Sequence, residues 1–158
     1  MGRPRWLLFS ALGGAVIVGD QVTKGWISGN YVVGLPAPIV GDLLRIDITH
    51  NQGAIFGLLQ GSALVFGLVS LAVIGVIVWY EARAGGSLLV TLALGLLAGG
   101  AVGNLIDRIR LGYVIDFMDA GIGTWRFYTF NVADSAISGA ILLLLLLAVL
   151  PSRTEAAA

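Results

Sequence analysis

Four long apolar runs divide the chain, with shorter polar segments between them. The runs cover residues 6–26, 61–80, 87–106 and 132–150, and each is close to the roughly 20 residues that a helix needs to cross a bilayer. The first run follows Arg3 and Arg5, as a secretory signal would, but no small-x-small cleavage pattern comes after it and three more apolar runs do. The pattern therefore predicts a membrane all-α core of four transmembrane helices, in a single integral-membrane domain over residues 1–158.

Two longer polar segments, residues 27–60 and 109–130, separate these runs. The first segment begins with residues typical of turns, namely Gly29, Asn30, Gly34, Pro36 and Pro38. Residues 45–49 then alternate between polar and apolar, which is the period of a half-buried strand. We therefore predict a small extracytoplasmic β-sheet in the first segment and a second outer loop over residues 109–130. Gly121 and Gly123 predict that residues 117–126 are mobile.

Composition agrees with a membrane protein and narrows the chemistry. The mean hydropathy is +0.95, and only 11% of the residues are charged. Because the net charge is zero, no nucleic-acid partner is expected. The chain has no cysteine, one histidine (His50) and one lysine (Lys24), which argues against thiolate or His-rich metal sites and a cysteine nucleophile. Carboxylates, hydroxyls and one amine remain, and we expect neither metal nor cofactor.

An even number of spans places both ends of the chain on one side of the membrane. Arg3 and Arg5 flank the first span, and positively charged flanks favour the cytoplasmic side. We therefore predict cytoplasmic termini. Both polar segments, and every candidate site residue, then face outward.

Two carboxylates stand out at that outer face, Asp116 in the second polar segment and Asp134 at the start of the fourth run. A carboxylate at the edge of a membrane span is costly, and such residues commonly serve function. If the two approach each other, they cannot both ionise cheaply and will share a proton. The ionised member can then activate water while the protonated member polarises a peptide carbonyl, as in aspartic proteases.

Simpler interpretations exist for each of these groups. Asn131 followed by Asp134 is a good helix N-cap with an acid in the first turn. Asp116 could be a solvated loop acid, and Asp119 is a competing carboxylate. Asp107 and Arg108 could be an ordinary interfacial pair.

Two further patterns lie closer to the N-terminus. Asp20 and Lys24, four residues apart, share one helix face, and they could form a modest ion pair or support a site. The small residues around Gly53 could form an ordinary tight turn or allow close backbone approach to a ligand.

Five short blocks together resemble a known family. They are residues 20–24 (DQVTK), 51–56 (NQGAIF), 103–108 (GNLIDR), 114–117 (VIDF) and 130–135 (FNVADS). In this order and spacing, the chain resembles bacterial lipoprotein signal peptidase (signal peptidase II), an integral-membrane aspartic endopeptidase. Ile55 stands where a smaller residue is common in that family, which would narrow the pocket.

The resemblance implies roles for the matching positions. Asp116 and Asp134 would be the catalytic dyad. The supporting and substrate-binding residues would be Asn104, Arg108, Asn131, Asn51, Asp20, Lys24, Gly53 and Phe56. It also implies the substrate, a prolipoprotein with a diacylglyceryl cysteine that is cleaved just before that cysteine. The enzyme would be a monomer surrounded by membrane lipid in the bacterial cytoplasmic (inner) membrane.

Two alternative functions remain open from the residues alone. A Ser/Lys membrane protease could use Lys24 with Ser135, although a lysine beside Asp20 should stay charged and be a poor base. Lys24→Arg would separate this reading from a carboxylate mechanism. A small proton-coupled carrier would also use buried carboxylates, but carriers usually place their site at the bilayer midplane.

Overall fold

The computed structural model describes residues 4–53, 63–84 and 87–150. Its four long helices are α1 (Trp6–Asn30), α2 (Ala63–Ala84), α3 (Leu88–Leu111) and α4 (Val132–Val149). Each contains a stretch long and apolar enough to cross a membrane, which confirms the four predicted spans. The first boundary differs, because Gly29 and Asn30 form the last turn of α1 instead of a loop.

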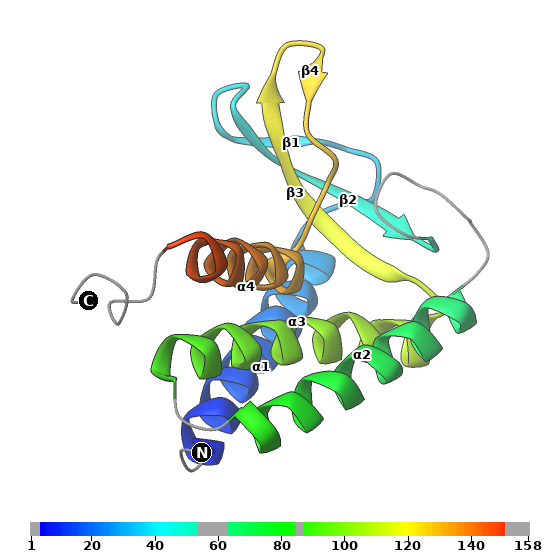
Figure 1. Cartoon of the computed structure of the whole chain (residues 1–158). Helices are drawn as coiled ribbons and strands as arrows, with labels where there is room; N and C mark the ends of the chain where they lie inside the picture. Colours follow the sequence, from blue (N-terminus) through cyan, green and yellow to red (C-terminus); the bar gives the residue numbers. More distant parts are fainter. Residues whose placement is uncertain (1–3, 54–62, 85–86, 151–158) are drawn as a thin grey trace.

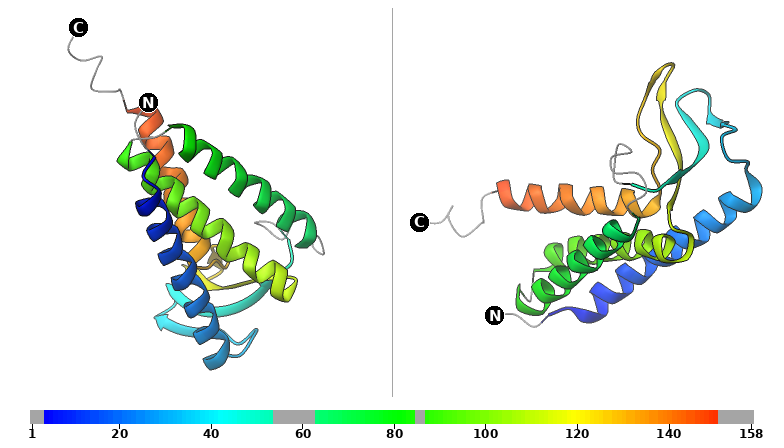
Figure 2. Two further views of the ribbon diagram at one scale, coloured as in Figure 1. Left: turned by 90° about the horizontal axis from the view of Figure 1, so that it is seen from below. Right: turned by 90° about the vertical axis from the view of Figure 1, so that its right-hand side faces the viewer.

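Helix α3 lies in the middle of the bundle, with α1, α2 and α4 packed around it (Figure 1, Figure 2). In its most apolar stretch 61% of the residues are buried, against 11–17% in the other three helices. The outer helices expose large apolar side chains such as Leu7, Leu64 and Val149, which are 78–86% exposed. A surface of this kind is stable only where lipid surrounds it.

Glycines on α3 allow this close packing. A Cβ on Gly99 would lie 2.7 Å from the carbonyl oxygen of Gly13 in α1, and a Cβ on Gly100 would lie 2.5 Å from that of Ala133 in α4. Small residues at such contacts let helix backbones approach each other, and this packing replaces the hydrophobic effect inside a bilayer. The two contacts fix α1 and α4 on different sides of α3.

A four-stranded antiparallel sheet stands at one end of the bundle, opposite the start of α1 and the end of α4 (Figure 1, Figure 2). Its strands, in spatial order, are β1 (Ala37–Val40), β2 (Leu44–Asn51), β3 (Val114–Ile122) and β4 (Trp125–Arg126). The predicted sheet is confirmed, but residues 109–130 are not a loop, because they supply β3 and β4. Strand β3 was not predicted because its sequence, VIDFMDAGI, does not alternate between polar and apolar residues.

Close packing in the β3–β4 hairpin accounts for Gly121, one of the two glycines on which the predicted mobility rests. A Cβ on Gly121 would collide with the backbone of Trp125 and Arg126 in the neighbouring strand. Gly121 is therefore needed for close strand approach. The mobility of residues 117–126 stays a prediction.

A small apolar core joins the sheet to the membrane helices. Ile27 of α1 packs with Ile46 and Ile48 of β2 and with Phe117 of β3. Burial of Phe117, which is 1% exposed, fixes the orientation of β3. Because neighbouring side chains on a strand point to opposite faces, Asp116 then points away from this core.

Candidate active site

Asp134 lies in the first turn of α4, where the chain re-enters the bundle. Asn131 caps this helix, since its side-chain oxygen accepts a hydrogen bond from the backbone N–H of Asp134 (2.9 Å). The Asp134 carboxylate in turn accepts one from the backbone N–H of Asn131 (3.3 Å), which completes a capping box. The helix-cap interpretation is therefore correct, and it also fixes the carboxylate in place.

Asp116 lies on β3, opposite Thr49 of β2 in the strand register. Its side chain is 2% exposed and accepts hydrogen bonds from the amides of Asn51 (3.0 Å) and Asn131 (2.7 Å). Burial and the nearby charge of Asp134 raise the pKa of Asp116 to about 7, although both amide hydrogen bonds act in the opposite direction. The interpretation of Asp116 as a solvated loop acid is wrong.

Two asparagine side chains connect the carboxylates. Asn131 donates to the side-chain oxygen of Asn104 (3.1 Å) as well as to Asp116. Asn104 then donates its own amide hydrogen to Asp134 (2.7 Å). A continuous path of hydrogen bonds therefore runs from one carboxylate through two amides to the other, and it sets their relative positions.

A buried ionic cluster lies directly behind Asn104. The ammonium group of Lys24 contacts Asp20 (2.8 Å), Asp107 (2.8 Å) and the side-chain oxygen of Asn104 (3.0 Å). These three acceptors match the three N–H donors of a lysine. Gln21 reinforces the cluster by donating to Asp107 (2.9 Å).

The cluster also reaches two other elements of the fold. Asp20 accepts the backbone N–H of Ala133 in α4 (3.0 Å), and Asp107 accepts that of Ile115 in β3 (3.1 Å). The ion pair predicted between Asp20 and Lys24 is confirmed. The suggested pair between Asp107 and Arg108 is wrong, because Asp107 points to Lys24.

Arg108 lies near the C-terminal end of α3, one turn beyond Asn104. Its guanidinium donates to the backbone oxygens of Asn104 (3.3 Å) and Gly53 (3.4 Å) and lies over the ring of Phe66 (5.8 Å to the centroid). Gly53 is buried, and its N–H donates to the side-chain oxygen of Asn51 (3.0 Å). Arg108 and Asn51 therefore hold Gly53, two residues after the end of β2, against α3.

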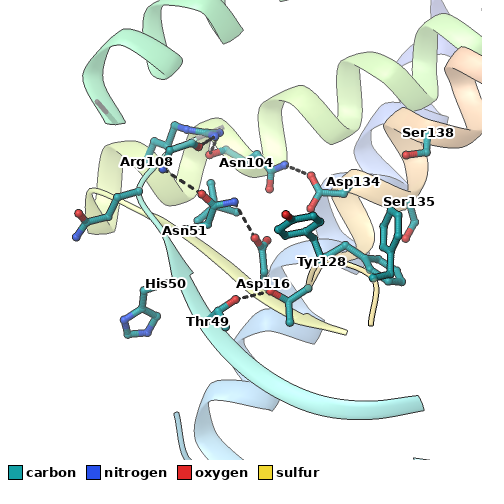
Figure 3. A pocket seen from close by; sticks show the side chains of 16 residues that line it. Thr49, His50, Asn51, Asn104, Arg108, Asp116, Tyr128, Asp134, Ser135 and Ser138 are labelled. Atoms are coloured by element: carbon teal, nitrogen blue, oxygen red, sulfur yellow. Dashed lines mark hydrogen bonds between the residues drawn. The ribbon is translucent and has the colours of Figure 1, made fainter. Parts of the chain in front are cut away.

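A cavity of about 580 Å³ opens between the sheet, the C-terminal end of α3 and the start of α4 (Figure 3). Both carboxylates line it, together with Asn51, Gly53, Asn104 and Arg108. Its apolar walls come from Val114, Phe127, Tyr128 and Phe130, and it continues along α4 past Ser135 to Ser138. The volume suits a peptide segment or a lipid group.

Most of the predicted site residues are brought together. Asn131 is buried beneath the cavity, and Asp20 and Lys24 lie behind Asn104. Phe56 and the departure at Ile55 lie outside the described residues. Sequence reasoning gave no site role to Asp107, Gln21, Thr49 or Thr129. For Asp107 and Gln21, the only sequence signal is their position inside the matching blocks, because Asp107 binds Gln21 and Lys24, which lie more than 80 residues earlier. Thr49 and Thr129 give no signal in the sequence.

Asp119 is held elsewhere and cannot compete for the role of Asp116. It accepts hydrogen bonds from Arg45 and Arg126, each as short as 2.7 Å. Burial alone would raise the pKa of Asp119, but these two guanidinium groups lower it below its usual value. Asp119 on β3 is therefore an ionised carboxylate that joins the β1–β2 hairpin, through Arg45, to the β3–β4 hairpin, through Arg126.

The Ser/Lys interpretation finds no support in the geometry. Ser135 donates its hydroxyl to the backbone oxygen of Asn131 (2.9 Å), whereas all three partners of the Lys24 ammonium are other groups. Among the residues that the structure describes, no group of three His, Asp or Glu side chains could hold a metal ion.

Comparison with known proteins gives one consistent result. A family model described as "Signal peptidase (SPase) II" matches residues 12–150. The chain is 39% identical to the lipoprotein signal peptidase of Geobacillus thermodenitrificans over 146 residues, which is 91% of each protein. It is 42% identical to that of Halothermothrix orenii over 133 residues, covering 84% of this chain and 89% of the relative.

Two solved structures share the fold. One, described as "Bacterial membrane enzyme structure by the in meso method at 2.3 A resolution", has a TM-score of 0.86 and 30% identity, covering 94% of this chain and 92% of its own. A second of the same description, at 1.9 Å resolution, has a TM-score of 0.86 and 28% identity, covering 96% and 98%.

Proposed function

The chain belongs to the signal peptidase II family of membrane aspartic peptidases, and from this premise we propose that it removes the signal peptide from diacylglyceryl-modified prolipoproteins. Cleavage falls just before the lipidated cysteine, and Asp116 and Asp134 form the catalytic dyad. The observation that carries this assignment is the hydrogen-bond path through Asn104 and Asn131, which holds both carboxylates at one cavity.

The proposed chemistry needs one proton on the pair. The raised pKa of Asp116, about 7, supports a dyad that still holds a single shared proton near neutral pH. The ionised carboxylate takes a proton from water as the water oxygen attacks the peptide carbon, and the protonated carboxylate donates to the carbonyl oxygen. When the C–N bond breaks, the nitrogen receives a proton from the dyad and one hydroxyl of the tetrahedral diol returns a proton to the dyad, so the pair again holds one proton. The products are a signal peptide with a new carboxyl end and a lipoprotein with a new amine.

The supporting residues keep this pair in place. Asn51, Asn104 and Asn131 donate amide hydrogens to the carboxylates, so each carboxylate has a fixed orientation before substrate binds. Arg108 and Gly53 shape the cavity wall. Asp20 and Lys24 act from behind Asn104.

The cavity suits a lipid-modified substrate. It combines apolar walls with the two carboxylates and continues along α4, a helix long and apolar enough to span the membrane. The acyl chains of a diacylglyceryl group can therefore stay in or near the bilayer while the peptide reaches the dyad. The four helices and the sheet belong to the single domain of our proposal, and we propose that the enzyme acts as a monomer.

The enzyme resides in the bacterial cytoplasmic membrane with its dyad at the outer face. The sheet lies at the end of the bundle opposite the start of α1 and the end of α4, and residues of β2 and β3 line the cavity. The basic residues before the first span favour a cytoplasmic location for the chain termini. The carrier interpretation loses its basis, because the family is one of enzymes and the carboxylates lie at one end of the bundle.

The direct test is a gel-shift cleavage assay with purified enzyme and a diacylglyceryl-modified prolipoprotein. Loss of a catalytic acid or base lowers rates by about 10²–10⁴-fold, so Asp116→Asn and Asp134→Asn should each show this loss, with or without chelator. Asp47→Asn, on β2 and outside the cavity lining, is the matched control and should cleave normally.

Each failure has a separate meaning. If the wild-type enzyme left a modified prolipoprotein intact, the proposed substrate would be wrong. If both Asn variants still cleaved it, the dyad assignment would be wrong while the substrate remained correct. Cleavage of a substrate whose cysteine is replaced by serine, and so carries no lipid, would contradict the lipid requirement.

A further inference from the structure

Two threonine hydroxyls meet at the sheet side of the cavity. The Oγ1 atoms of Thr49 and Thr129 are 2.6 Å apart. Both residues line the cavity, and Thr49 is labelled in Figure 3. Thr49 is the residue of β2 that lies opposite Asp116 in the strand register. The hydroxyl pair therefore lies next to one of the two proposed catalytic carboxylates.

This pair has one more hydrogen than its own contact can use. Each hydroxyl brings one hydrogen and can accept from others, and the single contact between them takes one hydrogen. No other hydrogen bond is formed by either side chain within residues 4–53, 63–84 and 87–150. Ser135, by contrast, donates its hydroxyl hydrogen to the backbone oxygen of Asn131. Among the described residues, one O–H of the threonine pair therefore has no acceptor, and both threonines line the cavity.

The neighbouring polar groups are arranged differently. Asn51 and Asn131 direct amide hydrogens to Asp116, and the carboxylates themselves offer mainly acceptors. The O–H of the threonine pair is a hydrogen-bond donor, so it suits a substrate group that can only accept a hydrogen bond. The commonest such group in a lipid-modified peptide is a carbonyl oxygen.

We propose that the Thr49–Thr129 hydroxyl pair donates a hydrogen bond to a carbonyl oxygen of the bound substrate and so positions it beside Asp116. This inference rests on the proposed function and adds a substrate-binding contact to it. Two carbonyl sources share the required chemistry, the peptide backbone near the cleaved bond and the esters of the diacylglyceryl group.

A purely structural role would give a different result. The contact also joins β2 to residues 127–130, so it could serve only to hold that wall together. Replacing both partners of a hydrogen bond by apolar groups of the same shape is nearly neutral for stability. The double variant Thr49→Val/Thr129→Val therefore keeps the wall packed while it removes both donors.

The test is steady-state cleavage of a synthetic diacylglyceryl lipopeptide by the wild type and the double variant, with melting temperatures measured in the same detergent. Loss of one neutral hydrogen bond to the substrate should raise KM by roughly three- to tenfold and leave kcat within about twofold, since the bond also exists in the ground state. Thr124→Val, in the exposed turn between β3 and β4, is the matched control and should not change KM.

Single variants keep the test decisive if the double variant does not fold. One of Thr49→Val and Thr129→Val must then raise KM, because one of the two hydroxyls is the donor, and Ser at that position should restore the wild-type KM. The proposal is overturned if KM stays unchanged in all variants, or if only kcat falls. In either case the wild type would still cleave, so the proposed function would survive.

A second substrate identifies the carbonyl. In an ether-linked dialkylglyceryl lipopeptide the ester carbonyls are absent. If the donor serves an ester, the KM difference between wild type and the double variant disappears on the ether substrate. If it serves the peptide backbone, the difference persists.

Discussion

Asp116 is a carboxyl group held between opposing influences. Burial and the charge of Asp134 favour its protonated form, while the amides of Asn51 and Asn131 favour its ionised form. The resulting pKa of about 7 means that the group releases its proton near neutral pH. Asn51 lies on β2 and Asn131 caps α4. A substitution at one of them therefore changes the pKa of Asp116 while the other amide stays in place.

The pH dependence of cleavage should follow this balance. A dyad that needs one proton loses its active form as the pH rises through the raised pKa of Asp116, so kcat/KM should fall above about pH 7. Asn51→Leu removes a donor that favours the ionised form, so the pKa rises further and the alkaline limb should move to higher pH. Rate profiles for both proteins between about pH 5 and pH 9 measure the shift.

The direction of the shift is the informative result. Asn30→Ala, at the exposed end of α1, is the matched control and should keep the wild-type limb. If the alkaline limb of Asn51→Leu stays in place or moves to lower pH, the hydrogen bond from Asn51 does not lower the pKa of Asp116, and this explanation is wrong.

At the scale of secondary-structure elements, Lys24 is the point where the bundle is held together. Its two carboxylate partners lie on α1 and α3, and those carboxylates accept backbone N–H groups from α4 and β3. Lys24 is 2% exposed and Asp20 is fully buried. A buried pair of this kind gives little net stability by itself, but loss of one member leaves an uncompensated charge.

Lys24→Met should therefore unfold much more easily than the wild type. The expected cost is about 3–5 kcal/mol, because Asp20 and Asp107 would remain buried without their cation. The triple variant Asp20→Asn/Lys24→Met/Asp107→Asn should recover part of this loss. Chemical unfolding in detergent, followed by tryptophan fluorescence, measures both values.

The matched control is Arg83→Met, which removes an exposed cation over the ring of Trp79. Its cost should stay below about 1 kcal/mol. Equal stability of Lys24→Met and the wild type would show that the cluster has no role in holding the helices.

Elements with a clear period could be predicted from the sequence, and contacts between distant elements could not. The four spans follow from apolar runs long enough to cross a bilayer, and β2 follows from alternation within residues 45–49. Strand β3 could not be predicted, because its partner β2 lies more than 60 residues earlier and its sequence does not alternate between polar and apolar residues.

The candidate site shows the same division. Asp134 could be singled out because a carboxylate is rare at the edge of an apolar run, whereas Asp116 is preferred to Asp119 because it lies in the matching block at residues 114–117. The partnership of Lys24 with Asp107, and that of Thr49 with Thr129, depends on how α1 packs on α3 and how β2 meets residues 127–130. Nothing local in the sequence encodes such contacts.

At the scale of the whole molecule, the absence of cysteine allows a direct test of orientation. Thr124→Cys places a thiol in the exposed turn between β3 and β4, and Ser87→Cys places one at the opposite end of the bundle, before α3. With an outward-facing sheet, a membrane-impermeant maleimide should label position 124 in intact cells and position 87 only after the membrane is opened. The reverse pattern would place the dyad on the cytoplasmic side.

The cap of α4 has a consequence for how the protein is made. Asn131 both starts this last helix and donates to Asp116, which precedes it in the chain. The two carboxylates therefore acquire their arrangement only when the final apolar segment has entered the bilayer and begun to wind. A partly synthesised or partly inserted chain would carry Asp116 without a partner. Proteolytic competence then requires insertion of α4, so a nascent chain without this helix could not cut neighbouring membrane proteins.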